Sequence, residues 1–130
     1  TILAFIVMFI LGGLWHAILM GDFYKELLTP DSREPHQIQF IASGVFLLAL
    51  SMAYLYPKGY RGGSPIKEGL VFGVIMGLIW IIPHGLVMHG MTATSGKLLL
   101  VDGLWHLFEQ GMGGVVIASV YGKDTESAST

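Results

Sequence analysis

Four long apolar runs constrain the fold of this chain more than any other feature. They cover residues 1–20, 38–55, 69–91 and 98–121. Each run is close to the ~20 residues that an α-helix needs to cross ~30 Å of hydrocarbon. Lipid cannot hydrogen-bond to a backbone, so only helices and closed barrels span a membrane, and these runs are too long for barrel strands. We therefore predict one all-α integral membrane domain, a four-helix transmembrane bundle with a polar tail at 122–130.

Composition supports a membrane protein and excludes several other classes. Of the 130 residues, 53% are hydrophobic and only 12% are charged, which is too apolar for a soluble domain of this size. The chain has no Cys, which excludes disulfides, thiolate metal sites and iron–sulfur clusters. The seven Lys and Arg residues are scattered along the chain, so we expect the lipid bilayer and not nucleic acid as its partner.

The first run is expected to be a membrane span and not a signal peptide, because it lacks a basic region and an A-x-A cleavage site.

Basic residues indicate the orientation of the four spans. Those on the side of the loop between the second and third runs and the C-terminus outnumber those on the other side: Lys58, Arg61, Lys67 and Lys123 against Lys25, Arg33 and Lys97. The positive-inside rule then places both termini in the cytoplasm, and we expect a bacterial inner membrane.

Glycines recur at four-residue spacing inside the runs. Gly69, Gly73 and Gly77 form a ridge of small residues, which lets helix backbones approach closely in lipid. Such ridges predict helix–helix contacts. They favour a compact bundle that forms a homo-oligomer or joins other membrane subunits.

Histidines fall at one depth in three of the predicted spans. The stretch GLWH occurs twice, at Gly13–His16 and Gly103–His106, and His84 follows Pro83 in the third run. Counted from the ends of their helices at 1.5 Å per residue, the three imidazoles lie roughly 8–12 Å beneath the same surface. Ionisable groups inside a membrane are costly, so three at one level predict a shared site.

Other polar and aromatic residues are predicted to lie at the same end of the bundle. Asp102, His106 and Glu109 share one helix face by their spacing, although Asp102 is also explained by the favourable charge at a helix N-terminus. The second run contributes Gln39 and Ser43 at this end. A Trp lies within one turn before each of the three histidines, where it either covers the site or belongs to an interfacial aromatic belt: Trp15, Trp80 and Trp105.

Three functions remain open for this polar level. The first is a metal or metallocofactor site, with His16, His84, His106 and Glu109 as ligands of Zn, Cu or Fe, or with two histidines as axial ligands of haem. The second is an accessory or assembly subunit of a larger membrane complex. The third is a proton or ion relay along the carboxylates and histidines. The sequence contains no nucleophile–base arrangement, so no catalytic residue or reaction is assigned.

The stretch ILGGLWHAILMGDFY, residues 10–24, resembles the first span of small uncharacterised bacterial membrane proteins with four spans. The arrangement of four spans with GG pairs in the outer ones resembles them as well. The resemblance implies a four-span fold and an unassigned activity, and it transfers no site residue to this chain.

Overall fold

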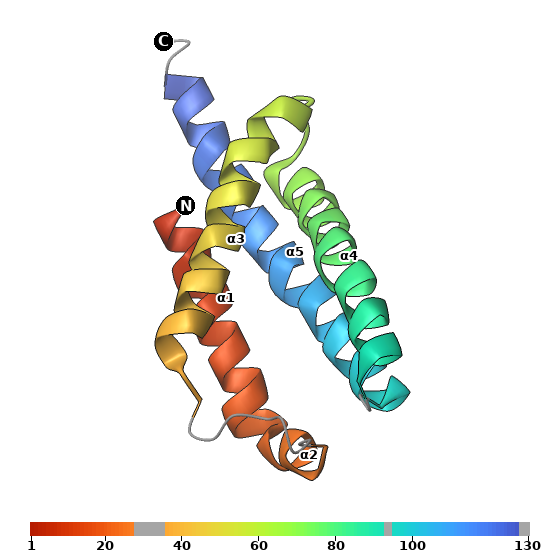
Figure 1. Ribbon diagram of the computed structural model, residues 1–130. Helices are drawn as coiled ribbons and strands as arrows, with labels where there is room; N and C mark the ends of the chain where they lie inside the picture. Colours follow the sequence, from red (N-terminus) through yellow and green to blue (C-terminus); the bar gives the residue numbers. More distant parts are fainter. Residues whose placement is uncertain (28–35, 93–94, 128–130) are drawn as a thin grey trace.

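The computed structural model describes residues 1–27, 36–92 and 95–127, and only the backbone of 123–127. Within these ranges the chain is all-helical and contains no strand, which confirms the predicted helical class (Figure 1). The helices are α1 (Ile2–Gly13), the π-helix η1 (Leu14–Leu19), α2 (Gly21–Glu26), α3 (Ile38–Gly59), α4 (Pro65–Met91) and α5 (Gly96–Ser127).

Three helical segments of the described chain are long and apolar enough to cross a membrane: Ile2–Leu19, Ile38–Gly59 and Pro65–Met91. They match the first three predicted spans. The share of the most apolar stretch that is buried inside the molecule is only 11%, 11% and 22% for these three segments in chain order. Their large aliphatic side chains therefore mostly face outward, as they do in lipid. The fourth predicted run lies in α5, which is the least apolar of the long helices and continues to Ser127.

α4 and α5 pack together through the predicted glycine ridge. Gly69, Gly73 and Gly77 are buried on α4. A Cβ at Gly73 would overlap the backbone of Gln110, and a Cβ at Gly69 would overlap that of Gly114. No rotamer change could relieve such an overlap, so these positions require glycine. The close approach of two helix backbones is what a ridge of small residues permits in lipid.

α5 is the central helix of the described structure. It packs most extensively against α4, and it also contacts α1 and α3, whereas α3 and α4 touch little (Figure 1). The buried core where α1, α3 and α5 meet consists of Ala4, Met8, Ala49, Met52, Tyr56, Ile117 and Ala118. Since α5 is covered on several sides by other helices, it tolerates polar residues that a lipid-facing helix would not.

A π-helical segment interrupts the first span at the GLWH stretch. α1 ends at Gly13, and residues Leu14–Leu19 continue as η1. After Met20 the chain turns into the short helix α2. π-helical turns are rare and occur frequently at functional sites, because the extra residue changes the direction of the side chains within a helix.

Candidate metal centre

The two GLWH stretches lie against each other. Trp15 of η1 and Trp105 of α5 are stacked with their ring centroids 4.4 Å apart and their planes 2° from parallel. The imidazoles that follow them are also close, with 6.2 Å between the ring centroids of His16 and His106. The repeated motif therefore places two tryptophans and two histidines in one layer between η1 and α5.

Asp102 lies between the two histidines. Its Oδ1 is 3.1 Å from His16 Nε2, and its Oδ2 is 3.6 Å from His106 Nε2. These three side chains each offer one ligand atom, and the three atoms lie within 4.8 Å of one another. We refer to His16, Asp102 and His106 as the His–Asp–His cluster.

Each histidine uses its other ring nitrogen elsewhere. His16 Nδ1 is 2.9 Å from the carbonyl oxygen of Gly12, and His106 Nδ1 is 2.9 Å from Oε2 of Glu109. A carbonyl and an ionised carboxylate only accept hydrogen bonds, so both Nδ1 atoms carry the proton and donate. In neutral imidazoles both Nε2 lone pairs then face the carboxylate of Asp102. Three acceptors that face one another require a positive charge, either protons on the imidazoles or a bound cation.

Glu109 is the most buried charged residue of the site, at 4% exposure. The side chains of the cluster are less enclosed, with exposed fractions of 37% for His16, 25% for Asp102 and 21% for His106. Gly12 leaves room for the Glu109 carboxylate, because a Cβ at Gly12 would lie 3.0 Å from its Oε1. The cluster is thus most enclosed on the side of Glu109 and less enclosed at His16.

Tyr24 is a member of the site that the sequence did not reveal. Its hydroxyl donates to Asp102 Oδ1 at 2.9 Å and accepts from Trp15 Nε1 at 3.0 Å. Burial raises the pKa of Tyr24 well above its usual range, so the hydroxyl remains a donor at neutral pH. Tyr24 lies on the short helix α2 that follows the first membrane-spanning segment. Only the turn after η1 directs it back to α5, and no sequence pattern predicts that direction.

The structure brings together only part of the predicted polar level. Asp102, His106 and Glu109 share one face of α5, which confirms that prediction. His84 is exposed on α4 and lies outside the cluster. At its level the face of α4 toward α5 is formed by Gly85, and adjacent residues point about 100° apart on a helix. α4 also packs mainly against α5 and not α1, so His84 does not approach His16.

The remaining predicted residues also lie apart from the cluster. Trp80 is 47% exposed on α4. Gln39 and Ser43 are exposed on α3, and the Ser43 hydroxyl donates to the carbonyl of Gln39 in its own helix at 2.7 Å. The Ser43 hydroxyl is therefore satisfied within α3, and neither residue belongs to the His–Asp–His cluster.

These features define an all-helical membrane protein with a His–Asp–His cluster between its first membrane-spanning segment and its central helix. Residues 1–118 match the family described as "Protein of unknown function (DUF1761)", and the chain belongs to this family. No curated protein and no solved structure shows significant similarity to this chain. The description of the family assigns no activity, so any inference about function depends on the geometry of the site.

Proposed function

We propose that the His–Asp–His cluster binds one divalent transition-metal ion. Imidazole nitrogens suit Zn, Cu and Fe, and a carboxylate oxygen completes a common ligand set. His16, His106 and Asp102 are the ligands in this proposal. Glu109 and the Gly12 carbonyl orient the two imidazoles, and Tyr24 orients the carboxylate.

The observation that carries the proposal is the orientation of the two imidazoles. Both fix their Nδ1–H on an acceptor and direct Nε2 at the same carboxylate. Metal-binding histidines almost always donate their second ring N–H to a carboxylate or a carbonyl, which sets the tautomer and the ring plane. Here each histidine has one such acceptor. A cation at the centre would remove the repulsion among the three facing acceptors.

The distances are compatible with a small ion. Bonds of ~2.0–2.2 Å at tetrahedral angles place ligand atoms about 3.4 Å apart. The separations of 3.1 Å and 3.6 Å between each Nε2 and Asp102 are close to that value. Three protein ligands leave a coordination position for water or a substrate, where the ion would act as a Lewis acid or lower the pKa of bound water.

A single ion suits the cluster better than a haem. The carboxylate of Asp102 lies between the two imidazoles, where a macrocycle would have to lie. The stacked Trp15 and Trp105 also lie directly beside them. Of the two kinds of cofactor that the sequence suggested, we therefore propose the single metal ion and not the haem.

Metal analysis of the protein purified in detergent tests the proposal. We expect one Zn, Cu or Fe per chain, or stoichiometric uptake when Zn²⁺, Cu²⁺ and Fe²⁺ are titrated separately against a competing chelator. Asp102→Asn and His16→Gln remove ligands and should abolish stoichiometric binding.

Two matched variants control this experiment. Asp22→Asn removes a fully exposed carboxylate, and His84→Gln removes the exposed histidine of α4. Both should bind metal as the unmodified protein does. If none of the three ions binds, or if the His84 variant loses binding as the His16 variant does, the proposal is wrong.

Protons are the alternative occupant, because two imidazolium rings would also satisfy Asp102. A relay would need a polar route beyond Glu109. The next residue, Gln110, is fully buried and its amide is directed to α4 at Gly77. The described residues thus favour a local site over a conduit. Proton flux in liposomes that is lost in Glu109→Gln, together with no metal binding, would instead support the relay.

We also propose that α5 is the fourth span and completes a four-helix transmembrane bundle in a bacterial inner membrane. Its length and its contacts with α1, α3 and α4 support this. The glycine ridge of α4 is used within the chain, so association with a second copy or with other subunits needs a different surface.

A further inference from the structure

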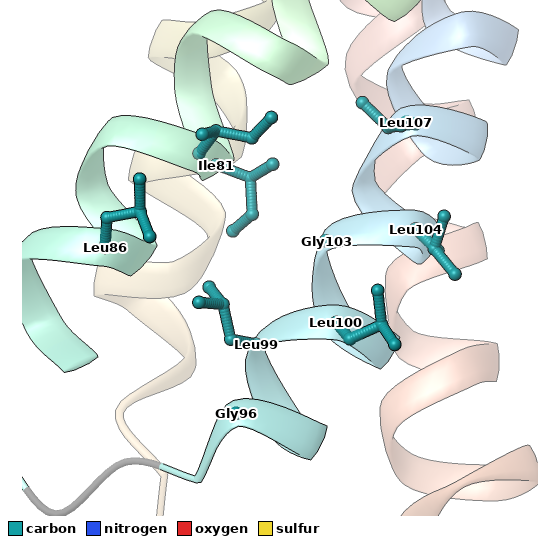
Figure 2. Close-up of a pocket in the computed structure, with 9 residues that line it drawn as sticks. Ile81, Leu86, Gly96, Leu99, Leu100, Gly103, Leu104 and Leu107 are labelled. Atoms are coloured by element: carbon teal, nitrogen blue, oxygen red, sulfur yellow. The ribbon is translucent and has the colours of Figure 1, made fainter.

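A separate cavity lies between α4 and α5, and its walls are aliphatic. Ile81, Ile82 and Leu86 of α4 and Leu99, Leu104 and Leu107 of α5 are among the residues that line it (Figure 2). Its volume is about 260 Å³. The metal ligands of α5 contact η1, whereas this cavity faces α4. It is thus independent of the proposed metal centre.

The cavity forms where the close contact of the two helices ends. At Gly69, Gly73 and Gly77 the backbones of α4 and α5 touch. Beyond Gly77 the buried positions of α4 are Ile81 and Gly85, and Gly85 packs against the side chain of Leu99. Leucine side chains on α5 then separate the helices, and the space between them is not filled by the chain.

The position and length of the cavity match one leaflet of a bilayer. It begins at Gly96, the first residue of α5, and reaches Leu107, eleven residues further along. At 1.5 Å per residue this is about 16 Å, and half of a ~30 Å hydrocarbon core is about 15 Å. A cavity with this almost wholly apolar lining offers water few hydrogen-bond partners, so it is suited to a hydrocarbon chain.

A positively charged residue follows the first residue of α5 that lines the cavity. Lys97 directly follows Gly96, and its Nζ lies 5.1 Å from the ring centroid of Phe23. The N-terminus of α5 adds the positive end of a helix dipole at the same level. A phosphate group at this height would meet the start of α5, and the flexible Lys97 side chain would reach it by leaving Phe23 of α2.

We propose that the cavity binds an acyl chain of an anionic phospholipid, whose phosphate group lies at Lys97. The aliphatic walls bind the chain, and the charge at the start of α5 selects the headgroup. The occupant enters from the bilayer, because Leu86, Leu100 and Leu104 are exposed by 59%, 63% and 60% on the outer surfaces beside the cavity.

Lipid retention after extraction from defined vesicles tests this proposal. The protein is reconstituted in equal amounts of phosphatidylglycerol and phosphatidylcholine, extracted in mild detergent and analysed by native mass spectrometry. We expect one phosphatidylglycerol per chain, preferred over phosphatidylcholine by about fivefold, the factor expected from one Lys near the surface. Lys97→Gln should remove this preference and leave the total amount of bound lipid unchanged.

Gly103→Leu fills the cavity, because a Cβ at Gly103 meets nothing within 4 Å. This variant should lose the bound lipid, whereas Gly90→Leu, at another open position on α4, should retain it. Leu86→Trp fills the cavity from the α4 side and serves if Gly103→Leu does not fold. Equal retention of both lipids by the unmodified protein, no retained lipid, or full retention by folded cavity-filling variants would each overturn the proposal.

Discussion

Asp102 is held by three groups that come from three different helices. His16 of η1, Tyr24 of α2 and His106 of α5 all contact its carboxylate. Neither imidazole can turn its proton toward Asp102 without giving up the hydrogen bond of its Nδ1–H. The side chains around the cluster therefore fix which atoms are available to an ion, and they can be tested one by one.

Glu109→Gln is expected to weaken metal binding without abolishing it. The amide oxygen can still accept from His106 Nδ1–H, but the negative charge beside the metal-binding imidazole is lost. Removal of such an outer partner typically costs about 10–100-fold in metal affinity. Zn²⁺ competition titration measures this effect. Glu26→Gln, on the exposed surface of α2, should leave the affinity unchanged, and an unchanged affinity in Glu109→Gln would refute the role of Glu109.

Gly12→Ala is expected to lower the affinity by less than about tenfold, because it displaces Glu109 without removing it. The new Cβ would lie 3.0 Å from Glu109 Oε1, so the carboxylate must shift relative to His106. Gly13→Ala is the matched control, because a Cβ there meets nothing within 4 Å. The same titration compares the two variants, and equal affinities would show that Glu109 accommodates the methyl group freely.

At the scale of helices, α5 carries the polar residues and the other helices shield them. One face of α5 presents Asp102 and His106 to η1 and Glu109 to α1, and another face packs on α4 through glycine. The α4–α5 contact therefore positions the helix that carries the site. The α4–α5 contact has two unusual features, which are the backbone contact at the glycines and the fully buried side-chain amide of Gln110.

Gly73→Ala is expected to destabilise the protein by about 1–3 kcal/mol, the usual cost of overpacking. Its Cβ would overlap the backbone of Gln110, so α4 and α5 would have to separate. Gly44→Ala, with nothing within 4 Å of the new Cβ, should leave the free energy of unfolding unchanged or raise it by about 0.5–1 kcal/mol, because alanine favours a helix over glycine. Thermal unfolding in detergent, followed by circular dichroism, compares them. Equal stability would mean that the two helices are not held by this contact.

Gln110→Leu is expected to leave stability unchanged or raise it by about 1–3 kcal/mol, because it removes an unsatisfied polar group. Among the described residues neither Nε2 nor Oε1 of Gln110 has a hydrogen-bond partner. The same unfolding measurement applies, with exposed Gln39→Leu as control. A clear loss of stability in Gln110→Leu alone would show that the amide is hydrogen-bonded.

At the scale of the whole molecule, the proposed metal centre and the proposed lipid cavity both lie toward the end where α5 begins. At the opposite end, aromatic rings pack together, among them Tyr56 and Tyr60, and Tyr56 also donates a hydrogen bond to Glu68. Both proposed sites thus lie in the same half of the molecule. The orientation of the chain decides toward which side of the membrane the His–Asp–His cluster lies.

Single-cysteine labelling tests this orientation without background, because the chain has no Cys. For a four-span bundle with cytoplasmic termini, a membrane-impermeant maleimide should label Asp22→Cys in cells with a permeable outer membrane and an intact inner membrane. Ser64→Cys, in the turn between α3 and α4, should react only after lysis. The reverse pattern would invert the orientation. If both positions are labelled from the same side, the chain between residues 22 and 64 crosses the membrane an even number of times or not at all.

Much of the helical framework could be predicted from the sequence, because it depends on local properties. Length and apolarity identify the spans that include Ile2–Leu19 and Pro65–Met91. Four-residue spacing predicts the contact face at Gly73, and helical periodicity predicts the shared face of Asp102 and His106.

The membership of the site could not be predicted in the same way. Equal depth relates His16, His84 and His106, but depth does not specify which helices are neighbours. Only the tertiary structure places α5 between α1 and α4, pairs His16 with His106 and leaves His84 exposed. The sequence by itself determined which residues lie on each helix face and at what height, since helix geometry is local. The tertiary structure decided which faces meet, and it added Tyr24 and Gly12, because packing depends on contacts between residues far apart in the chain.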